Sequence, residues 1–467
     1  MNASGGSAVA RAVTRCAAAG ERGWGRWSAL PTLQQDAVLY FLSGAFAVGT
    51  LLRAVSADYR EWAAMAMGPY FAAAALSLAL SHRSTTTRPS ITRRARGATV
   101  LTLVVVAVVV PLCFELVWRA DARAGAHAQP EVAVIERAGD RLAAGSDPYP
   151  AHPSTPGISP SSDRHSIDAT SFFPYLPAMA LFGLPNATKG LRELGDARVP
   201  LTATTFVVTG LAFLLALGDP ERRWRTVQML IALPTGALPL VTGGDDLPVL
   251  ALMLLALVLA ARRRPVLAGL AIGLAGTMKL TAWGLLVLLA LAVRDADDRR
   301  ATGRYLTAAA AVVVPVVLAG VAAGPHRFLV SVVEFPMGLT RVHSPAASPL
   351  LGQELVVLLP HLKKELTALL FGAAGAVLLW ALVRHTPRSP AAVARFAALA
   401  IIVVIVVAPA TRFGYFIYPV NLLVWGALLR SPPATPARGE GELEGRGADD
   451  PVRVDLRAAT ASGLERP

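Results

Sequence analysis

Residues 98–118 read ATVLTLVVVAVVVPLCFELVW, a run dominated by apolar side chains. At 1.5 Å per residue, a helix of this length spans about 30 Å, which is the thickness of the hydrocarbon core of a bilayer. The run lacks the period-two alternation of polar and apolar residues that is typical of the strands of a membrane β-barrel. It therefore predicts a transmembrane helix, and a membrane protein of the all-helical class.

The composition of the whole chain also indicates a membrane protein. Of its 467 residues, 54% are hydrophobic and only 16% are charged, whereas soluble domains carry about 25% charged residues. The formal net charge is +13, but the arginines stand in short clusters between apolar runs, which is typical of positive-inside topology and not of nucleic-acid binding. Cys16 and Cys113 are far apart and predict neither a disulfide framework nor a metal site.

Further apolar runs predict membrane-crossing helices at 37–56, 61–81, 199–217, 226–243, 246–262, 304–324, 365–383, 391–409 and 412–430. One more apolar stretch, 265–293, is longer than a single crossing needs. Because the basic clusters at both of its ends must lie on one side, it must enter and return as two short helices, with Gly276, Thr277 and Lys279 near the tip. The expected fold is an all-α polytopic membrane protein with about 12 membrane segments, including this short re-entrant hairpin.

The basic clusters also assign the two sides of the membrane. If the N-terminus is cytoplasmic, nearly all of the clusters fall on the cytoplasmic side. Lys363 and Lys364 fall outside and are the one local conflict. The predicted domains are a cytoplasmic tail at 1–36, a membrane domain at 37–430 and a disordered cytoplasmic tail at 431–467. Both termini are therefore expected in the cytoplasm.

Two long loops, 119–198 and 325–364, are external in this topology. Because a structureless loop of about 80 residues is unusual, the first loop should contain structure and carry function. Its segment 130–144 predicts a helix with a proline in the first turn, a glycine past the end and an apolar stripe that rests on the membrane surface. The aromatic-rich segment 172–177 leads into an apolar stretch that ends at Pro185 and is interpreted as re-entrant or interfacial.

Glu131 is the candidate catalytic residue. It lies at the start of the predicted external helix, on the apolar stripe and close to the bilayer surface. A carboxylate that is partly removed from water can accept a proton from a hydroxyl group. The alternative is structural, because an acidic residue in the first turn complements the helix dipole.

Lys279 lies in an otherwise apolar run of a chain that has four lysines and forty arginines. A charge at membrane depth costs about 2.5–3.5 kcal/mol even on the lenient insertion scale, so such a residue indicates a functional site. Lys279 either binds an anion such as a lipid phosphate or extends from the hairpin tip to the membrane interface.

Asp245 and Asp246 lie in a predicted external turn. They either bind a cation or sugar hydroxyls, or they form a solvated turn and helix cap. No further carboxylate lies nearby at metal-ligand spacing, so no metal is predicted.

Four cationic or aromatic residues share this predicted side, namely Arg341 and His343 in the second loop and Arg412 and Tyr415 at the head of the last helix. They either clamp a phosphate and stack on a sugar, or anchor helix ends as an interfacial belt.

The order of four motifs resembles that of glycosyltransferase family 87. The motifs are the acid-to-tyrosine stretch Glu131–Tyr149, the aromatic–proline stretch Phe173–Pro177, the glycine-rich stretch Gly269–Leu280 that contains Lys279, and the stretch Arg412–Pro419 of the last helix. Together they cover most of residues 98–430. The family has the GT-C fold and comprises polyprenyl-phosphate-sugar-dependent transferases of actinobacterial envelopes.

Two departures from the family pattern concern the catalytic acid. The family typically has Asp where this chain has Glu131, and the loop that carries it usually follows the first span, whereas further spans precede it here. Asp121 is therefore an alternative base.

The resemblance implies a polyprenyl-phosphate-dependent hexosyltransferase of the cell membrane, with its active site on the extracytoplasmic side. A sugar, mannose first among the candidates, would pass with inversion to an envelope glycolipid or lipoglycan, without a cofactor. Glu131 would act as the base, Lys279 and Arg412 would stabilise the leaving phosphate, and Tyr149 and Tyr175 would line the sugar or polyprenyl groove. The alternatives are a polytopic transporter or lipid flippase, and a catalytically silent envelope scaffold.

Overall fold

The computed structural model describes residues 27–430 apart from 28, 84–88, 122–126, 151–168, 189, 218, 295–299, 341 and 343. β-structure among these described residues is limited to one isolated bridge between Ala347 and Thr411. Seven helical segments in the described part are long and apolar enough to cross a membrane, by length and composition, namely Thr32–Arg53, Ala57–Arg83, Ile91–Asp121, Arg198–Leu215, Ala301–Ala323, Pro360–Arg384 and Pro390–Val407. The all-helical, multi-pass prediction is confirmed, while the number of segments and the sidedness of the termini stay predictions.

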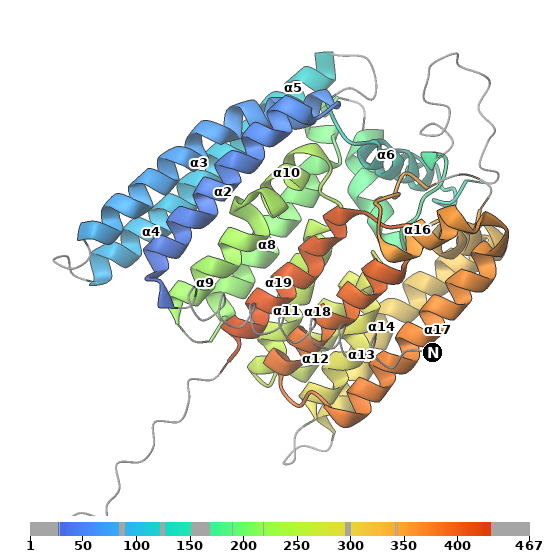
Figure 1. Cartoon of the computed structure of the whole chain (residues 1–467). Coiled ribbons are helices and arrows are strands. Elements are labelled where there is room, and N and C mark those ends of the chain that lie inside the picture. Colours follow the sequence, from blue (N-terminus) through green and yellow to red (C-terminus); the bar gives the residue numbers. More distant parts are fainter. Residues whose placement is uncertain are drawn as a thin grey trace, which may run out of the picture. The chain divides into compact units, whose positions relative to one another are not determined.

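The first three long segments lie side by side (Figure 1). α2 (Thr32–Arg53) and α3 (Ala57–Arg83) pack against each other across a three-residue connection. The third segment runs from α4 (Pro89–Val104) through a π-helical turn (Val105–Val109) into α5 (Val110–Asp121). The first of these helices begins at Thr32, within the predicted tail. α3 starts four residues and α4 nine residues before the predicted spans at 61–81 and 98–118.

A buried ion cluster joins these helices to α9 (Pro220–Val227). Asp36 of α2 pairs with Arg96 of α4 at 2.5 Å and with Arg225 of α9 at 2.6 Å, and its carboxylate is 1% exposed. Both arginines belong to clusters that the sequence places in the cytoplasm. The carboxylate of Asp36 therefore pairs with two guanidinium groups that are both predicted to lie on the cytoplasmic side.

α11 (Leu247–Ala261) is buried along almost its whole length, with 13 of its 15 residues buried. It packs against α8 (Arg198–Leu215) and against α12 (Pro265–Gly276). A helix that is apolar on every face is expected at such a central position.

The segment 226–243 is not the single continuous helix that was predicted, although its crossing of the membrane stays a prediction. A π-helical turn (Gln228–Ala232) ends at Leu233, whose backbone is extended with φ −83° and ψ 161°, and α10 (Pro234–Thr242) starts there. Pro234 explains the break, since a proline disfavours helical backbone in the residue before it and donates no hydrogen bond itself.

The stretch 265–293 forms α12 (Pro265–Gly276) and α13 (Thr281–Val293), separated by a turn. Glycines of α12 face the backbone of α14 (Ala301–Ala323) in the same order along both helices, so α12 and α14 run in the same direction. α13 must then run back to reach the start of α14. Two short helices and a turn occur where the sequence predicts them, and their re-entrance from the membrane surface stays a prediction.

The C-terminal part contains the second external loop and the last helices. Its elements are α15 (Pro325–Leu329), the π-turn Val330–Glu334, α16 (Leu351–Leu358), the 3-10 turn Pro360–Leu362, α17 (Lys363–Arg384), α18 (Pro390–Val407), the 3-10 turn Phe413–Phe416 and α19 (Ile417–Leu428). The predicted tail 431–467 is outside the described residues.

The loop 119–198, which is predicted to be external, is structured in its described parts, as expected. It contains α6 (Pro130–Ala143), a 3-10 helix η2 (Pro177–Ala187) and a 3-10 turn η3 (Arg192–Gly195). Gly139 of α6 and Gly183 of η2 bring the two backbones into direct contact, because a Cβ atom on either glycine would collide with the other element. Such close approach of two backbones requires glycine.

An ion network anchors this loop to the long helices. Arg119 of α5 forms a bidentate pair with Glu136 of α6, at 2.7 and 2.6 Å, and also pairs with Asp196. Arg198 of α8 donates to the same Asp196 at 3.0 and 2.8 Å. Burial alone would raise the pKa of Asp196, but the hydrogen bonds and charge of Arg198, with the charge of Arg119, lower it below its usual value.

Candidate active site

The turn between α12 and α13 brings Lys279 against the turn that precedes α11. The Lys279 ammonium lies 2.5 Å from a carboxylate oxygen of Asp245 and 2.5 Å from one of Asp246. It also lies over the Tyr175 ring, 5.1 Å from the ring centre, within range for a cation–π interaction. Residues that are far apart in sequence and that were predicted separately thus form one cluster around Lys279.

The partners of Lys279 decide between its two predicted roles only in part. Lys279 is only 9% exposed, so its side chain does not extend freely to a membrane interface. Its nearest anions are carboxylates of the protein, and the group of Lys279, Asp245 and Asp246 carries a net charge of −1 when all three are ionised. Burial works to raise the pKa of Asp245, but the charge and hydrogen bond of Lys279 lower it.

Tyr418 is a member of this cluster that the sequence analysis missed. Its hydroxyl donates to Asp246 at 2.5 Å and accepts a hydrogen bond from Thr281 at 3.0 Å. Tyr418 lies three residues after Tyr415, within the motif Arg412–Pro419. This spacing is the sequence signal that could have identified Tyr418, because helical residues three apart lie on the same face.

The aromatic–proline segment docks on the hairpin turn through its backbone. The N–H of Leu176 donates to the carbonyl of Met278 at 2.9 Å, and the N–H of Ala178 donates to that of Thr277 at 3.1 Å. At the C-terminal end of a helix, such carbonyl groups have no hydrogen-bond partner within the helix. These two bonds fix Tyr175 beside Lys279.

Tyr149 lies beneath this segment. It is 0% exposed, its hydroxyl donates to the Tyr175 carbonyl at 2.9 Å, and its ring packs against Phe173 and Phe328. Burial raises the pKa of Tyr149 well above its usual value, so the hydroxyl stays protonated as a donor. In this conformation Tyr149 supports Tyr175 and presents no surface to a ligand.

Glu131 pairs with Arg412. A carboxylate oxygen of Glu131 lies 2.5 Å from a guanidinium nitrogen of Arg412, and the two side chains are 19% and 37% exposed. Glu131 projects from the first turn of α6, while Arg412 precedes the short turn that contains Tyr415. The pair joins α6 to the segment that leads into α19.

The hydroxyl of Tyr175, whose ring contacts Lys279, senses the charges of both the Lys279 cluster and Glu131. Burial first, and then the charges of Asp245 and Glu131, raise the pKa of its hydroxyl, while the charge of Lys279 opposes them. Tyr415 likewise feels the charges of both Lys279 and Arg412. The two clusters therefore share one electrostatic environment with a partly exposed acid at its edge.

The start of α6 is held by further contacts. Gln129 donates through its backbone N–H to the carbonyl of Thr242 at 2.7 Å, and through its side chain to the hydroxyl of Tyr59 at 2.5 Å. Sequence reasoning missed both partners because they lie far away in the chain. These bonds fix the backbone two residues before Glu131.

The other predicted residues are not part of this group. Asp121 is exposed at the end of α5 and lines a different cleft, together with Glu61, Trp118 and His127. Arg341 and His343 lie outside the described residues. A neighbouring part of their loop is tied to the site, because the backbones of Ala346 and Ser348 bond Thr411, next to Arg412.

Comparison with known families gives a match over half of the chain. The model of glycosyltransferase family 87 matches residues 173–409, which is just over half of the chain. The chain belongs to glycosyltransferase family 87. The family 87 match includes Tyr175, Asp245, Asp246 and Lys279, and it leaves out Glu131 and Arg412 on either side.

Other comparisons add little. The search of curated proteins found no match. Among solved structures, the chain is similar to the crystal structure of ArnT from Cupriavidus metallidurans bound to undecaprenyl phosphate, with 16% identity and a TM-score of 0.41. The alignment covers 63% of this chain and 54% of ArnT, so the chain spans about half the length of that structure.

Proposed function

We propose that this member of glycosyltransferase family 87 transfers a hexose, mannose first among the candidates, from a polyprenyl-phosphate donor to an envelope glycolipid or lipoglycan. Transfer takes place on the extracytoplasmic face of the cell membrane. The observation that carries the proposal is the Glu131–Arg412 pair, because it sets a partly exposed carboxylate and a cation side by side. That is the pair of groups that transfer from a phosphate-linked sugar requires.

Glu131 is the proposed base. It takes the proton from an acceptor hydroxyl while that oxygen forms a bond to the anomeric carbon. The bond from the anomeric carbon to the phosphate oxygen breaks in the same step, and polyprenyl phosphate leaves with the bonding electrons. Attack in line with the leaving group inverts the anomeric configuration.

Arg412 is the proposed partner of the leaving phosphate. A guanidinium carries five N–H donors, and one of its nitrogens contacts Glu131. At 37% exposure the side chain keeps surface for a phosphate. Arg412 thus aligns the base and stabilises the charge that develops on the phosphate.

Asp245, Asp246 and Tyr175 are the proposed sugar contacts. The two carboxylates are 14% and 18% exposed, and carboxylates accept hydrogen bonds from sugar hydroxyls. Lys279 holds the two carboxylates together and adds positive charge near the phosphate. Tyr149 acts as a supporting residue through the Tyr175 backbone.

The test is sugar transfer by purified protein in lipid nanodiscs. The protein receives radiolabelled polyprenyl-phosphate mannose and an envelope lipid extract, with polyprenyl-phosphate glucose and galactose as parallel donors. A labelled lipid product supports the proposal, and the donor that gives it identifies the sugar. Absence of product with every donor, from protein that shows a cooperative thermal transition, would contradict it.

A further inference from the structure

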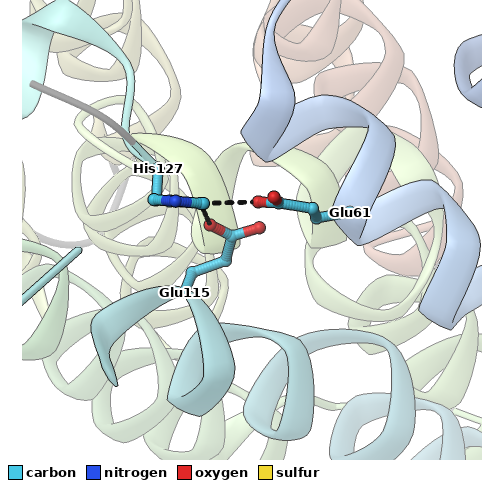
Figure 2. Close-up of side chains that lie close together, drawn as sticks. All are labelled: Glu61, Glu115 and His127. Carbon is cyan, nitrogen blue, oxygen red and sulfur yellow. Dashed lines mark hydrogen bonds and ion pairs between the residues drawn. The ribbon is translucent and has the colours of Figure 1, made fainter. Parts of the chain in front are cut away.

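Three potential metal ligands from three separate elements converge in a second cluster, whose residues are not among those placed in the proposed active site (Figure 2). They are Glu61 of α3, Glu115 of α5 and His127, which precedes α6. Nδ1 of His127 lies 2.7 Å from Glu61 Oε2 and 3.5 Å from Glu115 Oε2. One ligand atom from each residue lies within 4.8 Å of the other two.

Glu115 supplies an independent indication that a cation belongs here. Its side chain is 0% exposed, and neither of its carboxylate oxygens has a hydrogen-bond partner among the residues that the structure describes. Buried polar groups are normally hydrogen-bonded, and buried charges are normally paired or bound to metal. Figure 2 shows the carboxyl group of Glu115 directed at the space that Glu61 and His127 share.

Glu115 has no basic side chain within hydrogen-bonding distance among the described residues, and its neighbour Glu61 is a second carboxyl group. At 3.5 Å, Nδ1 of His127 is beyond hydrogen-bonding distance of the Glu115 oxygen, and this nitrogen is already engaged by Glu61. The guanidinium of Arg198 donates instead to Asp196 and to the carbonyls of His127 and Val241.

The cluster is open to solvent on one side. Glu61, Trp118, Asp121 and His127 line a cleft of about 300 Å³, and the Glu61 and His127 side chains are 29% and 21% exposed. An ion can therefore enter from water past Glu61 and His127 and reach the buried Glu115.

We propose that Glu61, Glu115 and His127 bind one divalent transition-metal ion, with Zn²⁺ as the preferred ion. One imidazole nitrogen with two carboxylate oxygens suits Zn²⁺ better than Ca²⁺ or Mg²⁺, which prefer oxygen ligands alone. Three protein ligands leave a position for water from the cleft. A metal ion binds Nδ1 of His127 only when this nitrogen carries no proton. If the imidazole is protonated before the ion arrives, metal binding releases a proton.

The ion would join the N-terminal helices to the segment that carries Glu131. His127 has a left-handed backbone with φ 59°, which is unfavourable for a residue other than glycine, and Arg198 holds its carbonyl at 2.8 Å. Glu131 follows four residues later. Glu61 lies before the part of the chain that matches the family model, so the N-terminal helices would contribute a ligand that positions α6.

The experiment measures metal binding in the absence of any sugar donor, so its outcome is independent of the proposed transferase activity. Full-length protein in nanodiscs is stripped with a chelator and titrated with Co²⁺ and then Zn²⁺. The expected results are Co²⁺ d–d absorption that Zn²⁺ displaces, one Zn²⁺ per chain by elemental analysis after dialysis, and a thermal transition that rises with Zn²⁺.

Variants of the two partly exposed ligands, Glu61→Gln and His127→Gln, should each lower the Zn²⁺ affinity by about tenfold or more and abolish the thermal shift. Asp121→Asn is the matched control, because it removes an acid of the same cleft that is not among the three ligands, and it should bind Zn²⁺ like the unaltered protein. Absence of stoichiometric metal would overturn the proposal, and so would equal Zn²⁺ binding by the unaltered protein and both ligand variants.

Discussion

At Lys279 one ammonium group faces two carboxylates, and all three side chains are less than one-fifth exposed. Removing one partner from a buried ion pair costs more than the pair contributes, because the remaining charge stays buried without compensation. Lys279 is therefore as much a structural residue as a binding residue. Its two roles have different experimental consequences.

Lys279→Met should destabilise the protein, by about 3 kcal/mol from comparable buried pairs, because it leaves Asp245 and Asp246 together without a cation. Adding Asp245→Asn and Asp246→Asn to this variant should recover part of the lost stability. The measurement is thermal unfolding in detergent for the single, double and triple variants. A stable Lys279→Met protein that only binds the donor more weakly would show instead that Lys279 is a phosphate ligand.

The sequence identified most of the site residues and few of their partners. Lys279, Asp245, Asp246 and Glu131 stood out by charge and position alone, and the structure brings each of them into the site region. The pairing of Glu131 with Arg412 spans 281 residues, and no local pattern encodes such a contact. For the same reason the convergence of the metal ligands on three elements was not predictable.

At the scale of elements, the position of Glu131 depends on the contact between α6 and η2. This contact is closest at Gly139 and Gly183, where the two backbones touch. The sequence predicted α6 at nearly the observed bounds, because a proline start, an apolar stripe and a glycine end are local signals. It did not predict the partner of α6, since η2 is not an amphipathic helix.

Gly183→Ala should separate α6 from η2, because its Cβ atom would collide with the carbonyl of Ile135. We expect a loss of about 1–3 kcal/mol in stability, as for overpacked cores, together with a loss of transfer activity. Gly210→Ala in α8 is the control, since its Cβ atom meets nothing within 4 Å, and alanine favours a helix by up to about 1 kcal/mol. Equal thermal stability of the two variants would refute the close α6–η2 contact.

For the whole molecule, hydropathy predicts the helices better than their assembly. Runs of apolar residues located the long helices within a few residues, because crossing the hydrocarbon core demands length and apolarity alone. Pro234 divided one predicted span, which hydropathy does not detect. The sidedness of the chain depends on the arginine clusters, and it can be measured.

Two single-cysteine proteins test the predicted sidedness, each made after Cys16 and Cys113 are replaced by serine. Thr188→Cys lies on an exposed position of the first external loop, and Thr386→Cys lies on an exposed position of the turn between α17 and α18. A maleimide that does not cross membranes should label Thr188→Cys in intact cells, and it should label Thr386→Cys only after lysis. The reverse pattern would place the Glu131 region in the cytoplasm.

The most direct measurement is the initial rate of sugar transfer by Glu131→Gln, Glu131→Asp and Asp121→Asn, each reconstituted in nanodiscs with the donor that the unaltered protein uses. Without a carboxylate at position 131 no group takes the acceptor proton, so Glu131→Gln should lose at least about 100-fold in rate, as expected for a general base. Glu131→Asp should keep measurable activity, and Asp121→Asn should transfer at the unaltered rate. Full activity of a folded Glu131→Gln protein, with loss of activity in Asp121→Asn, would contradict the assignment and make Asp121 the base.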